Sequence, residues 1–187
     1  MRNSQIRNLS TIAKIGALSA LAVGLMYLEF PIFSVYPWLK MDFADVPALI
    51  GGFALGPVAG VLIEVIKNFL NFILKSSTGG VGELANLTLA IALVLPASLI
   101  YRRNKSRKNA IIGLSVGSIC MIALAPILNY FVLIPLFIGF LGPDFDIGLY
   151  LIAGAVPITV IKAVAESIVV ILLYKRLSGI LHKQPRQ

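Results

Sequence analysis

Long apolar runs follow one another along most of this chain. Six such stretches occur, at roughly 7–30, 45–56, 57–75, 83–101, 110–138 and 149–174. Most reach the ~20 residues that a helix needs to cross a bilayer, and the short second one ends at Gly56-Pro57, where one helix stops and another begins. Charged residues make up 13% of the chain, against about 25% in soluble domains. We therefore predict an all-α integral membrane protein with six transmembrane helices, forming a single membrane domain over residues 1–187.

The basic residues are distributed in a way that predicts the orientation. Twelve of the sixteen lysines and arginines lie in three clusters, at the N-terminus, in the loop 102–108 and near the C-terminus. With six spans, all three clusters fall on one side of the membrane. The positive-inside rule makes that side cytoplasmic, so both termini are predicted to be cytoplasmic in a multi-pass protein of the cell membrane. We interpret the clusters as topology signals and contacts with anionic lipids, and not as a nucleic-acid site.

The third apolar stretch carries polar residues on one helical face. Glu64, Lys67, Asn68 and Asn71 recur at the spacing of an α-helix. Ionisable residues inside a span are candidates for function, since charges are unfavourable in a bilayer. Glu64 and Lys67 are three residues apart and can neutralise each other. The sequence leaves open whether they form an internal ion pair or contact a ligand.

Polar residues from three other stretches converge on the outer or middle part of the predicted bundle. They are Asn86, Asn129, Thr159 and Lys162. Lys162 lies ~20 Å along its helix from the outer end, and a lysine at that depth needs a partner. Glu166, four residues on, is one candidate partner, and a ligand is the other. An apolar pocket with a few such groups suits a flat, mostly apolar ligand with polar edges.

The link 31–44 is unusually apolar for a loop on the outer face. It contains Tyr36, Trp38 and Leu39 among other apolar residues. Irregular backbone at membrane depth is tolerated where it is buried in protein or lines a cavity, which favours a lid folded over the bundle. The alternative is an interfacial belt of aromatic residues.

Motifs of catalysis, nucleotide binding and metal binding are missing from the sequence. Its single histidine, His182, lies in the C-terminal tail, and the chain has neither an HExxH nor a GxSxG motif nor a Walker sequence. The single cysteine, Cys120, rules out a multi-cysteine metal site. We therefore expect neither an enzyme nor a resident cofactor or metal.

Three segments carry a resemblance to a known family. They are L-K-M-D-F-A-D-V-P-A-L-I-G-G-F-A-L-G-P (39–57), E-V-I-K-N (64–68) and G-G-V-G-E-L-A-N (79–86). This pattern resembles the riboflavin-specific S components of energy-coupling factor (ECF) vitamin transporters. The resemblance implies a membrane subunit that captures riboflavin from the outer face. It also implies partners, namely a transmembrane coupling protein and two ATPase subunits.

The resemblance further implies which residues contact the coupling protein and which contact the flavin. Ala13 and Ala17 match the small-residue pattern that contacts the coupling protein, and such a pair allows close helix approach. Thr159 departs from the family, in which an asparagine is frequent at this point. The family's flavin pocket uses the first loop and the fourth to sixth helices, which gives as candidate contacts Leu39, Met41, Asn86, Asn129, Tyr130, Thr159 and Lys162.

Two other functions stay open at this point. An S component of the same architecture for another small vitamin would share most of these features. A stand-alone proton-coupled carrier is the second alternative, and in that protein the titrating groups would be Glu64, Lys67, Lys162 and Glu166.

Overall fold

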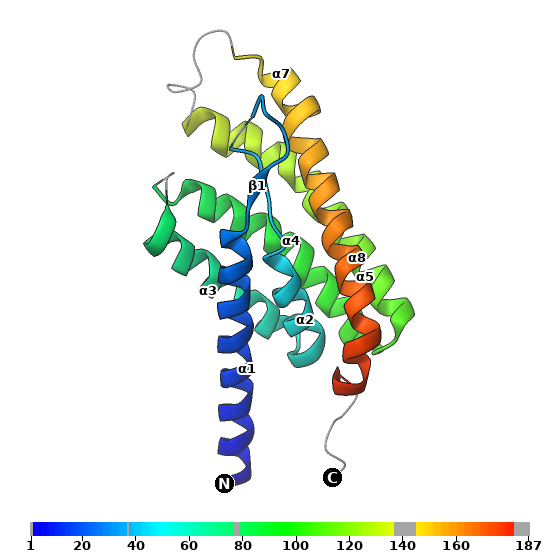
Figure 1. Ribbon diagram of the computed structural model, residues 1–187. Coiled ribbons are helices and arrows are strands. Elements are labelled where there is room, and N and C mark those ends of the chain that lie inside the picture. Colours follow the sequence, from blue (N-terminus) through cyan, green and yellow to red (C-terminus); the bar gives the residue numbers. More distant parts are fainter. Residues whose placement is uncertain (1, 37, 77–78, 137–144, 182–187) are drawn as a thin grey trace.

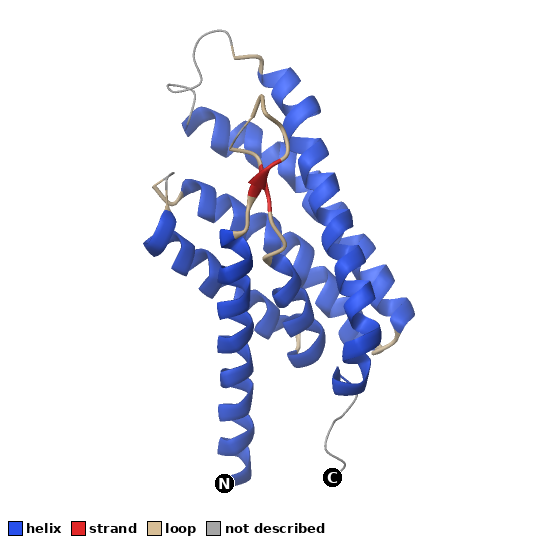
Figure 2. Cartoon of the chain, in the orientation of Figure 1, coloured by secondary structure: helices blue, strands red, loops and turns tan. Residues whose placement is uncertain are grey.

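Helices account for most of the structure, which is a computed structural model describing residues 2–36, 38–76, 79–136 and 145–181 (Figures 1 and 2). Side chains are described from Leu9 to Tyr174 within these ranges. The α-helices are α1 (Arg2–Tyr27), α2 (Asp45–Leu55), α3 (Pro57–Lys75), α4 (Val81–Arg103), α5 (Arg107–Leu128), α7 (Ile147–Tyr150) and α8 (Val156–Leu181). Two π-helical segments, η1 (Asn129–Leu133) and η2 (Leu151–Ala155), continue α5 and join α7 to α8.

The predicted apolar stretches coincide with these helices. In the described part of the chain, five helical runs are long and apolar enough to cross a membrane: Leu9–Tyr27, Pro57–Lys75, Val81–Arg103, Arg107–Leu136 and Ile147–Tyr174. The remaining apolar helix, α2, has 11 residues, which falls short of the ~20 needed for a full span. A sixth crossing by α2 therefore stays a prediction.

The break between α2 and α3 lies where the sequence predicts it. Gly56 caps α2 with φ 108°, a left-handed conformation that side-chain-bearing residues rarely adopt. Pro57 then occupies the first turn of α3, where its missing N–H costs nothing because that group has no partner within the helix. The two helices consequently form a tight hairpin.

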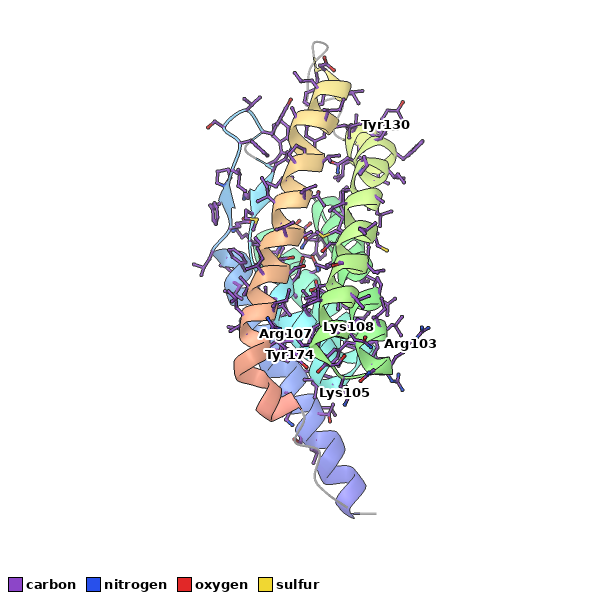
Figure 3. The ribbon with its side chains drawn as sticks, turned by 90° about the vertical axis from the view of Figure 1, so that its right-hand side faces the viewer. Arg103, Lys105, Arg107, Lys108, Tyr130 and Tyr174 are labelled. Carbon is purple, nitrogen blue, oxygen red and sulfur yellow. The ribbon has the colours of Figure 1, made fainter. Side chains whose placement is uncertain are left out.

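The two ends of the bundle differ in the residues they carry. The start of α1 and the end of α8 lie at one end, which we call the terminal end (Figure 1). Arg103, Lys105 and Arg107 lie toward this end, whereas Tyr130 lies toward the opposite, loop end (Figure 3). Lys183 and Arg186 of the predicted C-terminal cluster lie outside the described residues.

Close backbone contact joins α4 to α5. A Cβ atom added at Gly117 would lie 2.3 Å from the carbonyl oxygen of Leu93, and one added at Gly113 would lie 2.6 Å from that of Ala97. Small residues permit this approach, which is how helices gain packing contacts inside a membrane. Leu93, Leu114 and Met121 belong to the buried core beside this seam.

A short antiparallel pair of strands forms the root of the link between α1 and α2. Strand β1 (Phe30–Pro31) pairs with β2 (Lys40–Met41), with Phe30 opposite Met41 and Pro31 opposite Lys40. The all-α prediction did not include these strands, because two-residue strands produce no recognisable alternation of polar and apolar residues. The pairing brings the segment between them back over the loop end of the bundle (Figure 2).

Candidate functional site

A cavity of about 510 Å³ lies near the loop end of the bundle. This volume falls within the range of small-molecule sites, about 300–1,000 Å³. Its walls come from the link after α1, from α3 and α4, and from α5 with η1, η2 and α8. Segments far apart in the sequence therefore meet around one space.

Five of the seven predicted ligand contacts line this cavity: Leu39, Asn86, Asn129, Thr159 and Lys162. They come from four separate parts of the chain, as the predicted convergence requires. Their grouping around one cavity follows from the packing of α4, α5 and α8.

The other two predicted contacts, Met41 and Tyr130, are not among the residues that line the cavity. Met41 is buried, but it follows Lys40 in strand β2, where successive side chains point to opposite faces, and Lys40 is the one that lines the cavity. Tyr130 is 51% exposed and lies against Phe131 at a ring distance of 5.0 Å. It follows Asn129 by one residue, so the helix turns its ring to the outside of the bundle (Figure 3).

Asn129 is held in place by two hydrogen bonds. Its amide donates to the carbonyl oxygen of Ala125 at 2.8 Å, and its side-chain oxygen accepts from the Tyr150 hydroxyl at 2.8 Å. It begins the π-helical segment η1, three residues after Pro126. Proline lacks an N–H for the helical ladder, and π-helical turns are frequent at functional sites. The local distortion fixes an amide at the cavity wall.

The remaining polar wall residues are also partnered by protein. The Thr159 hydroxyl donates to the carbonyl oxygen of Ala155 at 2.8 Å, which leaves its oxygen able to accept. The Asn86 amide donates to the side-chain oxygen of Asn68 at 3.0 Å. Asn68, from the polar stripe of α3, is thus a support for a cavity residue.

An aromatic cap covers part of the cavity. We use this name for Tyr36, Trp38, Phe145 and Tyr150, whose ring centroids lie 5.1–6.5 Å apart in every pair. Trp38, Phe145 and Tyr150 line the cavity directly. A Cβ atom added at Gly154 would lie 2.9 Å from the Tyr36 ring, so the absence of a side chain there admits the cap. This arrangement supports the predicted lid over a purely interfacial belt.

Three charged residues lie at the rim of the cavity. The Glu29 carboxylate accepts a hydrogen bond from Lys40 of β2 and another from Lys75 at the end of α3, each at 2.7 Å. Partial burial alone would raise the pKa of Glu29, but the two ammonium groups outweigh it, and the pKa lies below the usual value of 4.5. Glu29 therefore ties the root of the lid to α3.

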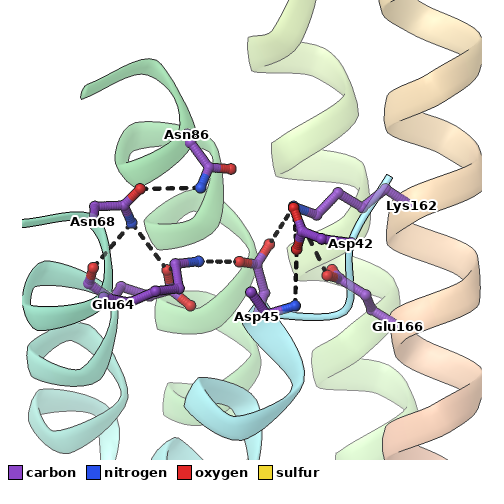
Figure 4. Close-up of polar contacts among 9 residues, drawn as sticks. Asp42, Asp45, Glu64, Asn68, Asn86, Lys162 and Glu166 are labelled. Carbon is purple, nitrogen blue, oxygen red and sulfur yellow. Dashed lines mark hydrogen bonds and ion pairs between the residues drawn. The ribbon is translucent and has the colours of Figure 1, made fainter. Parts of the chain in front are cut away.

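Lys162 has three acidic partners, and two of them, Asp42 and Asp45, were not among the candidates from the sequence. Its ammonium lies 3.2 Å from both carboxylate oxygens of Asp42 and 3.3 Å from Asp45, whereas Glu166 is 4.0 Å away (Figure 4). Helical spacing had pointed to Glu166, because a sequence shows neighbours along a helix and not residues 120 positions away. Asp42, assigned to the external link, is instead buried.

Lys67 is enclosed at the other end of the same network. It forms ion pairs with Asp45 and with Glu64, and both its own side chain and theirs are fully buried. Of the two possibilities that the sequence left open, the structure contains the ion pair between Glu64 and Lys67. Lys67 and Glu64 do not line the cavity, so the geometry gives them a structural position.

Several cavity residues escaped the sequence analysis. Tyr150 and Met121 lie in apolar runs, and Phe145 lies in the link between two of them, so nothing in the sequence marked these three residues out. Glu29 and Lys75 lie at helix ends, where charged residues are ordinary. Tyr150 had one usable signal, since a buried tyrosine hydroxyl needs a partner.

The small-residue face of α1 is exposed. Ala13 and Ala17 both face outward, as do Gly16 and Ala20 beside them. The opposite side of α1 packs on α2 and α3. The predicted interface pair is therefore not used for packing within the described part of this chain.

Comparison with known proteins places the chain in a family. Residues 10–174 match the family described as the substrate-specific component of ECF transporters. The Riboflavin transporter RibU of Staphylococcus aureus (strain TCH60) is 40% identical over 173 residues, covering 90% of each chain. The Riboflavin transporter FmnP of Bacillus subtilis (strain 168) is 33% identical over 176 residues, covering 91% of this chain and 93% of the relative.

The fold agrees with this assignment. A solved S component of a bacterial ECF transporter is similar with a TM-score of 0.81 and 38% identity, over 94% of this chain and 99% of that one. Members of the family are transporter components, which confirms that the chain is not an enzyme. The chain belongs to the family of substrate-specific, or S, components of ECF transporters.

Proposed function

We propose that this chain is the riboflavin-binding subunit of an ATP-dependent ECF importer. Relatives that align with about nine-tenths of its length are named as riboflavin transporters. The chain has an internal cavity of suitable volume, about 510 Å³. Riboflavin is the transported ligand and not a cofactor.

The observation that carries the proposal is the mixture of groups around the cavity. The flavin ring system is flat and apolar on its faces, with carbonyl and nitrogen groups at its edge. The aromatic cap offers rings for stacking, and Asn129, Thr159 and Lys162 offer donors and acceptors. We assign Leu39 and Asn86 to the same pocket, and Met41 to its support from the buried side of β2.

The proposed orientation places the cavity at the outer face of the cell membrane. The basic loop around Lys105 lies toward the end opposite Tyr130 and η1 (Figure 3). By the positive-inside rule that end is cytoplasmic, with both termini, and its lysines and arginines meet anionic lipid headgroups. Residues 1–187 then form one membrane domain with six spans, the short α2 included.

A test of ligand class needs only the purified protein. Membranes from cells supplied with riboflavin should yield yellow protein with a flavin absorbance spectrum, and titration of the stripped protein should quench riboflavin fluorescence. Thiamine and biotin, added in excess, should not displace the flavin. Colourless protein that binds another of these vitamins would favour the alternative S component.

The proposed partners are a transmembrane coupling protein and two ATPase subunits, with Ala13 and Ala17 at the contact. Replacing both alanines with tryptophan should abolish ATP-driven uptake while the isolated subunit still binds riboflavin. Ile12→Trp is a matched control, because Ile12 is 64% exposed on the same helix but outside the pair. Uptake that survives the double replacement, or that needs a proton gradient and no ATPase, would contradict this part of the proposal.

A further inference from the structure

Six ionisable residues form one buried network beside the cavity. We call it the acid–lysine cluster. Each member is at most 6% exposed. It runs from α3 through α2 to α8, and Figure 4 shows most of its contacts. Its members are Asp42, Asp45, Glu64, Lys67, Lys162 and Glu166.

The cluster has more acids than bases. Four carboxylates face two ammonium groups, so with every group ionised it would carry two excess negative charges. An unpaired charge in a membrane interior is strongly unfavourable, and one that lacks a counter-charge is neutralised instead. The count therefore favours additional positive charge, as protons or as a cation, and a single proton removes one of the two excess charges.

Glu166 is the member least provided with partners. Its side chain is 0% exposed, and neither carboxylate oxygen has a hydrogen-bond partner among the residues that the structure describes. Asp42 differs, since it accepts from Lys162 and also from the N–H of Ala44 at 2.8 Å. An ionised carboxylate without a donor is among the most unfavourable groups to bury. A protonated carboxyl group removes that penalty.

A metal ion is a weaker explanation. Carboxylate oxygens of Asp42, Asp45 and Glu166 lie within 4.8 Å of one another, a spacing that would suit a cation. However, the Lys162 ammonium lies 3.2 Å from Asp42, 3.3 Å from Asp45 and 4.0 Å from Glu166. It already occupies the place that a metal would take.

We propose that the acid–lysine cluster is a proton-binding site, in which Glu166 carries a resident proton that leaves Lys162 available to the cavity. Lys162 lines the cavity, and Glu166 lies one helical turn further along α8. When Glu166 loses its proton, its carboxylate attracts the Lys162 ammonium away from the cavity. Binding of the proton then strengthens binding of the ligand, and by linkage binding of the ligand strengthens binding of the proton.

The charged groups that face Glu166 come from its own helix and from three other segments. They are Asp42 from the link before α2, Asp45 from α2, Lys67 from α3 and Lys162 from its own helix. Helix α5 also packs on α8, but its charged residues Arg107 and Lys108 lie at its start, near the terminal end (Figure 3). The proton can reach the cluster through Asp42 and Lys162, which both line the cavity.

The first test does not depend on the identity of the ligand. Infrared difference spectra of the purified protein, recorded at neutral and alkaline pH, should contain the carbonyl stretch of a protonated carboxyl group. That band should be absent from Glu166→Gln, which has nearly the same shape and is neutral at every pH. The variant should also unfold at nearly the temperature of the unchanged chain, because it imitates the protonated acid.

Ligand binding gives the second test, which rests on the proposed function. Riboflavin affinity of the unchanged chain should fall as the pH rises into the alkaline range. In Glu166→Gln it should stay flat, and at neutral pH it should lie within about twofold of the unchanged chain, the change typical of a substitution that breaks no interaction. Proton loss by riboflavin itself at alkaline pH would lower the affinity of both proteins equally.

Three results would overturn the proposal. They are the absence of a Glu166 carboxyl band, a large loss of thermal stability in Glu166→Gln, and an affinity that depends on sodium or calcium and loses this dependence in Glu166→Gln. If the purified protein binds no riboflavin but keeps the carboxyl band, the proposed function fails while the proton site stands.

Discussion

The two ends of this bundle are built on opposite principles of packing. Toward the terminal end, α4 and α5 touch backbone to backbone at Gly117, and the space between helices is filled by residues such as Leu49 and Leu93. Toward the loop end, the helices, the lid and the aromatic cap surround about 510 Å³ of space. Close packing therefore characterises one half and open space the other. The acid–lysine cluster lies at their junction, with Lys67 enclosed and Lys162 at the cavity.

The largest effect is expected at the enclosed end of the cluster. Lys67→Met should destabilise the protein by about 3–5 kcal/mol, because it leaves the buried carboxylates of Asp45 and Glu64 without their common partner. Thermal unfolding in detergent would measure the loss. Lys14→Met is the control, since Lys14 is exposed on α1. Equal stability of the two variants would show that the enclosed pairs do not hold the packed half together.

A smaller loss is expected at the helix seam. Gly117→Ala should cost about 1–3 kcal/mol, because the new methyl group meets the backbone of Leu93, which cannot move aside as a side chain can. Gly24→Ala is a matched control in α1, where an added Cβ atom meets none of the described residues within 4 Å. There the change should be neutral or stabilising by up to about 1 kcal/mol, from helix propensity. If both variants unfold at the same temperature, close approach at the seam is unimportant.

The cavity half should respond in affinity and not in stability. Asn129→Ala should weaken riboflavin binding by about 1–3 kcal/mol, the range for leaving a buried polar partner unsatisfied. Tyr130→Ala should bind as the unchanged chain does, because this neighbouring ring faces outward. Fluorescence titration of both variants checks the difference. A larger loss for Tyr130→Ala than for Asn129→Ala would reverse our placement of the two residues.

The smallest effect concerns the rim. Glu29→Gln removes two ion pairs whose lysine side chains are 41% and 38% exposed, so about 0.2–1 kcal/mol is expected. Hydrogen exchange should become faster around Leu39 and Lys40 in the unliganded protein, and bound riboflavin should slow it.

The rim contact should also depend on pH. Because the folded state lowers the pKa of Glu29, the contact is fully present above its usual value of 4.5 and is lost as the pH falls through the lowered one. Exchange in Glu29→Gln should lack this acid dependence. An acid dependence that persists in the variant would assign it to another group.

The helices could be predicted from the sequence because apolar length and a proline after a glycine are local signals. The position of Asn129, Thr159 and Lys162 at the cavity could be predicted for a similar reason, since a polar residue in an apolar run is conspicuous. The pairing of Lys162 with Asp42 could not, because it depends on how α8 packs against the link before α2. The outward direction of Tyr130 could not be predicted either, because one residue of helical rotation separates it from Asn129 and a pattern of residue types cannot resolve that. Phe145 and Tyr150 resemble any other apolar residues until the fold gathers them.

The ion pair between Asp42 and Lys162 has a consequence for how such a subunit can change its ligand. The pair fixes the chain just beyond β2 to α8, while β1 and β2 fix both strands of the link to each other. The segment between these anchors is therefore held at both ends, and its Tyr36 and Leu39 side chains also pack against Gly154 of η2. We therefore expect a relative's sequence grafted between Pro31 and Lys40 to be accepted only where position 154 keeps the absence of a side chain that admits Tyr36.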